Sequence, residues 1–89
     1  MNFKKSTRPG KKYMVVAPNG KTIHFGDIKM QQYRDTTGLG LHTHLNHNDE
    51  TRRKSYLARA KGIRNKAGEL TWKDKNSSNY FSVKYLWSV

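Results

Sequence analysis

Residues 12–26 read KYMVVAPNGKTIHFG, and this stretch decides the fold because two β-rich runs flank the dipeptide Asn19-Gly20. Asn-Gly is favoured in two-residue type I′ turns, where both central positions need a positive φ. We therefore expect a β-hairpin in which Pro18 faces Lys21. Four apolar side chains then share one face of the hairpin: Met14, Val16, Ile23 and Phe25. This face is predicted to enter the core.

A second local pattern predicts a helix over residues 49–61. Asn48 can cap its N-terminus, and Gly62 stands where a left-handed residue often ends a helix. An apolar stripe follows the helical spacing: Tyr56, Leu57, Ala60 and Ile63. Arg53 projects from the middle of this stripe, so we expect it to hold the fold or a neighbouring subunit.

The remaining segments predict shorter elements. Residues 1–12 carry five basic residues and no acid, and are predicted to form a basic flexible tail. Residues 27–37 favour a short helix over an irregular connection. Leu70 and Trp72 indicate a short strand, and Ser77 or Ser78 can cap an aromatic helix over residues 80–87. The prediction is a single α+β domain, residues 13–89, with an N-terminal β-hairpin, a central basic helix, a short strand and a C-terminal aromatic helix.

Length and composition indicate one thin core. With 89 residues, 34% of them hydrophobic and 11% aromatic, burial must rest on a few large side chains. The chain has no cysteine, which excludes a disulfide or a thiolate zinc site as a staple. No apolar run reaches the length of a membrane span, and the N-terminus lacks the apolar segment of a signal peptide. Docking into a larger assembly could supply the missing stability.

Charge is the strongest indication of a partner. The 18 lysines and arginines against 6 acidic residues give a net charge of +12, which favours nucleic acid or an acidic protein surface. The cations predicted to bind such a partner are Lys4, Lys5, Arg8, Lys11, Lys12, Arg52, Lys54, Arg59, Lys61, Arg64 and Lys66. A structural role is predicted for Arg53, Tyr56, Trp72, Phe81 and Trp87.

Three histidines, His42, His44 and His47, have the residue type of a transition-metal site. Their spacing is unfavourable, because His47 lies beyond two turn-forming residues and no fourth ligand is defined. We expect these rings to pack, to bond backbone or to face anions, and predict neither a metal nor another cofactor. No phosphate loop, serine elbow or paired acidic centre is present, and a nuclease centre around His47 would lack carboxylates, so the sequence predicts a non-enzyme.

A longer pattern resembles a known family. Its blocks are KKYMVV and KTIHFG, Tyr33 with Asp35, His47-Asn48-Asp49, Arg52-Arg53, Tyr56, Arg59, Ser78, Phe81-Ser82 and Tyr85-Leu86-Trp87. This pattern, over residues 11–87, is similar to small basic proteins encoded by nucleocytoplasmic large DNA viruses of algae and protists. The chain departs from that pattern at Ala60, where many relatives have histidine, and at Ser77 or Ser78, where several have proline.

The resemblance implies a viral product made in the host cytoplasm or nucleus and carried in the virion. Two functions remain open. The first is a virion structural protein, a minor capsid or cement component that binds larger capsid subunits through basic and aromatic surfaces. The second is a DNA- or RNA-binding protein that contacts phosphates without sequence preference, through the tail and the basic helix. Neither function implies a small-molecule substrate.

Overall fold

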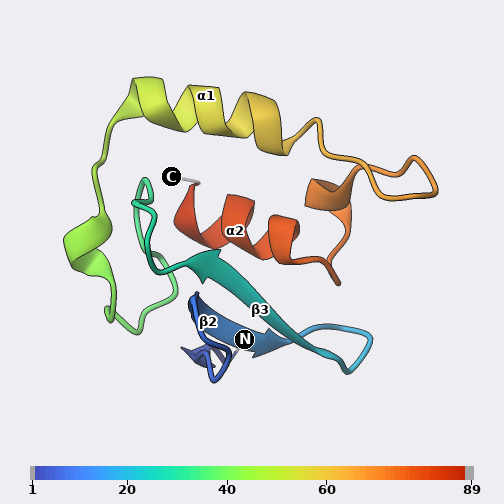
Figure 1. The fold of residues 1–89 in the computed structure, drawn as a ribbon, viewed down its shortest axis with the longest axis horizontal. Coiled ribbons are helices and arrows are strands. Elements are labelled where there is room, and N and C mark those ends of the chain that lie inside the picture. Colours follow the sequence, from blue (N-terminus) through green and yellow to red (C-terminus); the bar gives the residue numbers. More distant parts are fainter. Residues whose placement is uncertain (1, 88–89) are drawn as a thin grey trace.

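The computed structural model describes residues 2–87 and has an α+β fold (Figure 1). Three strands form an antiparallel sheet in the order β1-β2-β3, and the helices follow in the chain. The elements are β1 (Lys4–Lys5), β2 (Lys11–Val16), β3 (Thr22–Asp27), the 3-10 turn η1 (Thr43–Leu45), α1 (Glu50–Ala60), the 3-10 turn η2 (Thr71–Lys73) and α2 (Ser78–Leu86). The predicted α+β fold class is therefore confirmed, with the strands first and the helices later in the chain.

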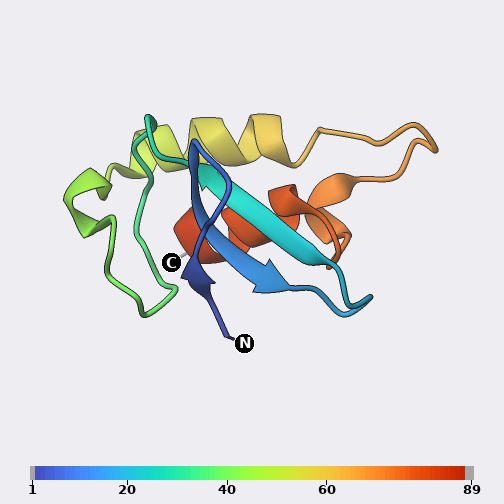
Figure 2. The ribbon, with the colours of Figure 1, turned by 60° about the horizontal axis from the view of Figure 1, so that its bottom comes forward.

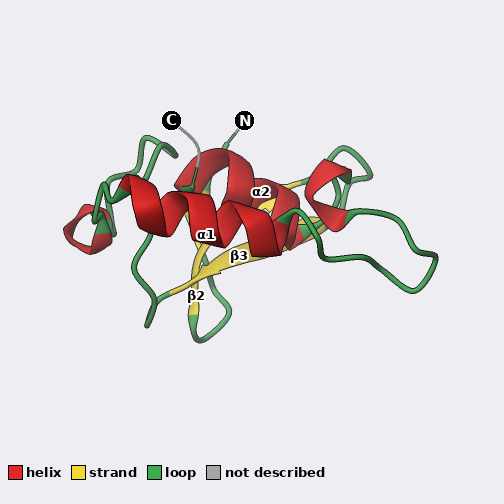
Figure 3. Cartoon of the chain, turned by 90° about the horizontal axis from the view of Figure 1, so that it is seen from above, coloured by secondary structure: helices red, strands yellow, loops and turns green. Residues whose placement is uncertain are grey.

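The aromatic helix α2 is the central layer. It lies between the sheet and α1 in Figure 1, and in the view from above in Figure 3 α1 lies in front of α2 and the strands. Its buried side chains are Phe81, Val83 and Leu86. Phe81 and Leu86 belong to the core that includes Tyr13 and Phe25. Because the helix has a neighbour on both sides, its sequence is apolar nearly all round.

The hairpin forms, but its predicted register is wrong by one residue. Val16 pairs with Thr22 and Tyr13 pairs with Phe25. Pro18 has the fixed φ that suits the second position of a type I turn, so the loop starts at Ala17, whose carbonyl accepts from the Gly20 amide at 2.9 Å. Gly20 then takes a positive φ of 85°.

This three-residue loop exchanges the two faces of β2. Val15 and Tyr13 enter the core, whereas Val16 is 61% exposed. Of the four side chains expected inside, Phe25 is fully buried and Ile23 packs against the core.

Part of the expected flexible tail belongs to the sheet, because residues 4–5 form β1 and residues 11–12 begin β2, which corrects the prediction for residues 1–12. Lys4 pairs with Met14 and Lys5 with Tyr13, so β1 lies along β2 (Figure 2). Phe3 supplies the physical reason, because its ring packs edge-on against Tyr85 at 4.6 Å and anchors the segment to the core.

Two predictions of shorter elements also need correction. Residues 27–37 contain no helix; their buried members are Gln32 and Tyr33, and Gln32 forms a single bridge with Asn46. The expected strand at Leu70 is a single bridge to Arg64 within its own loop, so no neighbouring strand extends it. Trp72 lies in η2.

A polar side chain caps the N-terminus of each helix, and the cap of α1 lies one residue after the predicted one. Asp49, rather than Asn48, caps α1, because its carboxylate accepts from the amides of Thr51 and Arg52 at 3.0 and 3.3 Å. Gly62 does not take a positive φ; α1 ends at Ala60, and the residue that caps its C-terminus, Lys61, has a right-handed conformation. Ser77 caps α2, as predicted, by accepting from the Tyr80 amide at 3.2 Å.

Candidate functional site

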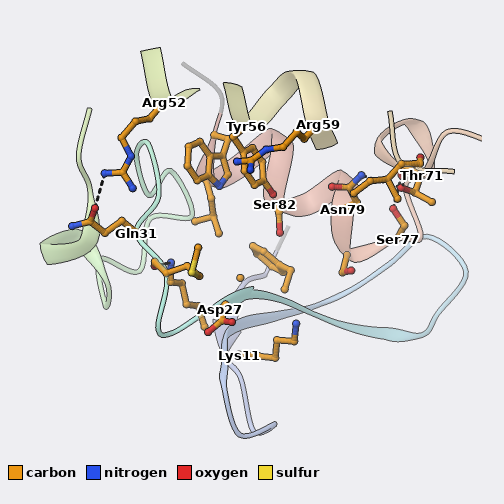
Figure 4. A pocket seen from close by; sticks show the side chains of 18 of the residues that line it. Lys11, Asp27, Gln31, Arg52, Tyr56, Arg59, Thr71, Ser77, Asn79 and Ser82 are labelled. Atoms are coloured by element: carbon orange, nitrogen blue, oxygen red, sulfur yellow. Dashed lines mark hydrogen bonds between the residues drawn. The ribbon is translucent and has the colours of Figure 1, made fainter. Parts of the chain in front are cut away.

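A groove of about 660 Å³ lies between α1 and β3, with α2 as its floor (Figure 4). We call it the basic groove, and its cationic side chains are Lys11, Lys12, Arg52 and Arg59. Tyr56 and Arg59 reach it from α1, Ser82 and Asn79 from α2, and Asp27 from the end of β3. Gly26 allows the floor to approach the strand, because a Cβ there would lie 3.0 Å from a Leu86 methyl group.

An aromatic pair forms the apolar end of the groove. The Tyr56 ring stacks on Trp87 with 3.9 Å between centroids and 9° between planes. Burial raises the pKa of Tyr56, so its phenol stays neutral. Phe25 and Leu86 continue the apolar lining towards the sheet. The groove thus offers aromatic and aliphatic surface beside positive charge.

The rim of the groove is electropositive. Arg52 donates to the Gln31 side chain at 2.6 Å across one end, as the dashed line in Figure 4 shows. The Arg59 side chain lines the groove and has no hydrogen bond or ion pair to any residue within 2–87. Asp27 is the single acid among the described lining residues, and its carboxylate already accepts from the Lys29 amide at 2.8 Å. An anionic ligand therefore meets net attraction here.

Arg53 lies on the other side of α1 and joins three segments of the fold. Its Nε donates to the Trp87 carbonyl at 3.0 Å, and its Nη1 pairs with Glu50 at 2.7 Å. The guanidinium also lies over the Tyr33 ring, 5.5 Å from the centroid. These contacts fix the end of α2 against α1 and so position the aromatic pair of the groove.

We expect Arg53→Lys to lower the free energy of unfolding by about 1–2 kcal/mol, because an ammonium group cannot make the forked set of contacts. Lys61→Ala is the control. Lys61 is exposed and its ammonium lies 4.9 Å from the Trp72 ring, so we expect a loss of about 0.5 kcal/mol or less. Urea unfolding followed by far-UV circular dichroism measures both, and equal losses would contradict the structural role of Arg53.

Lys12 was predicted to bind a partner, and the structure corrects this because Lys12 is only 1% exposed. Its ammonium donates to the Met30 carbonyl at 2.8 Å and to the Gln32 side chain. Burial lowers the pKa of Lys12 to about 8, against the opposing attraction of Asp27 and Asp35. Lys12 is a buried structural lysine at the base of the groove.

The other predicted cations lie outside the basic groove. Lys4 and Lys5 are exposed on β1, and Arg8 in the turn after it. Arg64 donates to the Gly68 carbonyl at 2.7 Å and closes its own loop. Lys54 and Lys66 are exposed, and Lys61 lies beside Trp72. Of the eleven cations named from the sequence, the groove thus gathers four.

The histidines do not converge on one point. His42 packs edge-on against Tyr13 at 5.4 Å, and His47 Nδ1 accepts from the Asp49 amide at 2.9 Å. Burial lowers the pKa of both rings, which favours their neutral forms. Within residues 2–87, no group of three histidine or carboxylate side chains is placed to hold a metal ion.

Sequence reasoning missed a buried polar network beside the groove. Gln32 accepts from Lys12 and donates to the His42 carbonyl and to the Asn46 side chain at 2.8 and 2.7 Å. Tyr13 donates to Asp35, and burial together with this bond raises the pKa of Tyr13 to about 12. The bonded partners are 10 to 22 residues apart in the sequence, so no local pattern predicts this network. The one available signal was the block of Tyr33 and Asp35 in the family resemblance.

The fold and the site define a small α+β domain with a basic, partly apolar groove. Residues 1–37, which include all three strands of the sheet, match a family of unknown function (DUF5754). No curated protein and no solved structure matches the chain. Within residues 2–87, no helix has the length and hydropathy needed to cross a membrane.

Proposed function

We propose that this chain is a small, non-enzymatic structural protein of a virus particle, a minor capsid or cement component that binds acidic surfaces of larger capsid subunits. One observation carries the proposal: within residues 2–87 the basic surface has a single ion pair, Arg53 with Glu50. Three of the remaining carboxylates accept from backbone amides, those of Asp27, Asp49 and Asp74, and Asp35 accepts from Tyr13. The exposed cations are therefore left for anions outside the chain.

The setting of the proposal comes from the sequence resemblance to small basic proteins of large DNA viruses. The proposed location is the virion, with assembly in the host cytoplasm or nucleus. The thin core supports the same setting, because docking on a larger subunit adds buried area that 89 residues do not provide alone.

Nucleic acid is the second candidate, favoured by the spread of exposed cations over separate elements. Lys4 and Lys5 lie on β1, whereas Arg59 and Lys66 lie at and beyond the end of α1. Such a distribution can follow a phosphate backbone without reading bases.

Mass spectrometry of purified, nuclease-treated particles tests the proposal. We expect the protein in a fixed ratio to the major capsid subunit after the genome is removed. Its absence from particles would end the proposal. Its loss together with the genome, with submicromolar binding to a 20-base-pair duplex that weakens steeply with salt, would favour the second candidate.

A further inference from the structure

The free edge of β3 borders the basic groove. β2 is the central strand of the sheet, so β3 has a strand neighbour on one side alone, and its other edge lies towards the helices in Figure 1. An unpaired edge of this kind presents backbone amides and carbonyls that can template another strand. Three residues of β3, Phe25, Gly26 and Asp27, line the basic groove.

The hairpin loop fixes which residues face the open edge. The Ala17 amide donates to the Lys21 carbonyl at 2.9 Å, so in the alternation of an antiparallel pair Ile23 and Phe25 bond to β2. Thr22 and His24 then point their backbone groups away from β2. Beyond the strand pairing, no described residue forms a hydrogen bond with these groups.

We propose that the basic groove binds an extended acidic segment of a partner protein, which adds to the free edge of β3 as a fourth strand. This inference rests on the proposed function and specifies how the acidic partner is held. β3 has six residues, so a segment of similar length, about 20 Å, matches the edge. Backbone bonds to Thr22 and His24 supply the alignment, as in other strand-addition complexes.

Charge complementarity selects the acidic occupant. Arg52 and Arg59 lie on the α1 wall opposite β3. Lys11 lies on β2, where it pairs with Asp27, the single acid among the described lining residues. Alternate side chains of an added strand point to opposite faces, so acidic ones can meet these cations while apolar ones cover Tyr56 and Trp87. A second copy of the chain is disfavoured at this edge, because each copy carries a net charge of +12.

Amide hydrogen exchange of the full chain tests the strand addition directly. The probe is a ten-residue peptide with blocked ends in which glutamate alternates with valine. We expect the Thr22 and His24 amides to exchange at least tenfold more slowly with the peptide than without it. A peptide methylated on alternate backbone nitrogens removes the pairing edge and should give no protection. Protection by both peptides, or by neither, would overturn the inference.

Two double variants distinguish peptide binding in the groove from attraction by the net charge of the protein. Arg52→Ser with Arg59→Ser removes two groove charges, and Lys54→Ser with Lys66→Ser removes two exposed charges elsewhere. We expect the first pair to weaken peptide binding at least tenfold in 0.15 M salt and the second less than threefold. Equal weakening would show that the peptide is held by net charge alone.

Thr22→Pro tests the backbone bonds. Proline is tolerated on an edge strand when the missing amide would point outward, so the fold should persist by circular dichroism while peptide binding falls at least tenfold. Unchanged binding would overturn strand addition. A duplex that protects Thr22 and His24 when the peptide does not would assign the edge to nucleic acid. These failures leave the particle experiment untouched, so the inference and the proposed function fail separately.

Discussion

Gln32→Ala is expected to lower the free energy of unfolding by about 3–5 kcal/mol. Gln32 is fully buried, and its side chain accepts from Lys12 and donates to the His42 carbonyl and to Asn46. Alanine leaves the Lys12 ammonium with the Met30 carbonyl as its remaining hydrogen-bond partner, and it removes the side-chain bonds to the His42 carbonyl and to Asn46. Urea unfolding followed by far-UV circular dichroism measures the loss.

Gln31→Ala is the matched control. The neighbouring glutamine is exposed, and its side chain accepts from Arg52 at the rim of the groove. We expect a change within about 0.5 kcal/mol, as for surface substitutions in general. Similar losses at the two positions would show that the buried network does not stabilise the fold.

Elements defined by local chemistry could be predicted from the sequence. The Asn19-Gly20 turn, the helical spacing around Tyr56 and the Ser77 cap depend on residues within a few positions of each other, and each marks an observed element. The predicted strand register was wrong because Pro18 and Asn19-Gly20 favour different turns, and a shift of one residue exchanges the two faces of a strand. The prediction of a flexible tail was wrong because the Phe3 ring packs against Tyr85, which lies 82 positions away in the sequence.

Part of the candidate site could likewise be predicted from the sequence, and part could not. Composition and helical spacing indicated Arg52 and Arg59, because an exposed helix face is visible in the sequence. The groove itself depends on how α1 stands over the open edge of β3, which no local pattern encodes. Lys12 shows the opposite error: a lysine in a basic run suggests solvent, yet Gln32 and Met30 enclose it.

Lys12 and Tyr13 are neighbours in the buried network and affect stability in opposite directions as the pH rises. The pKa of Lys12 is about 8 in the folded chain and near 10.5 when unfolded, so between these values the unfolded chain binds more protons and stability increases with pH. The pKa of Tyr13 is about 12 against 10.0, so stability is lost between pH 10 and pH 12.

We therefore expect the free energy of unfolding to rise by about 2 kcal/mol between pH 7 and pH 10, and to fall above pH 10. The full Lys12 shift corresponds to about 3 kcal/mol, and the part above pH 10 is offset by Tyr13. Urea unfolding at intervals of half a pH unit gives the profile.

Lys12→Met separates this effect from the titration of the other lysines, because it removes one buried ammonium and leaves the remaining charges in place. Its absolute stability depends on how the methionine packs, but the rise between pH 7 and pH 10 should be smaller by about 2 kcal/mol than in the native chain. Titration of carbon-13-labelled lysine side chains by NMR checks the cause, since one resonance should move near pH 8 and be missing in Lys12→Met. Parallel profiles for the two proteins would mean that Lys12 stays protonated, so that the bonds to Gln32 and Met30 outweigh its burial.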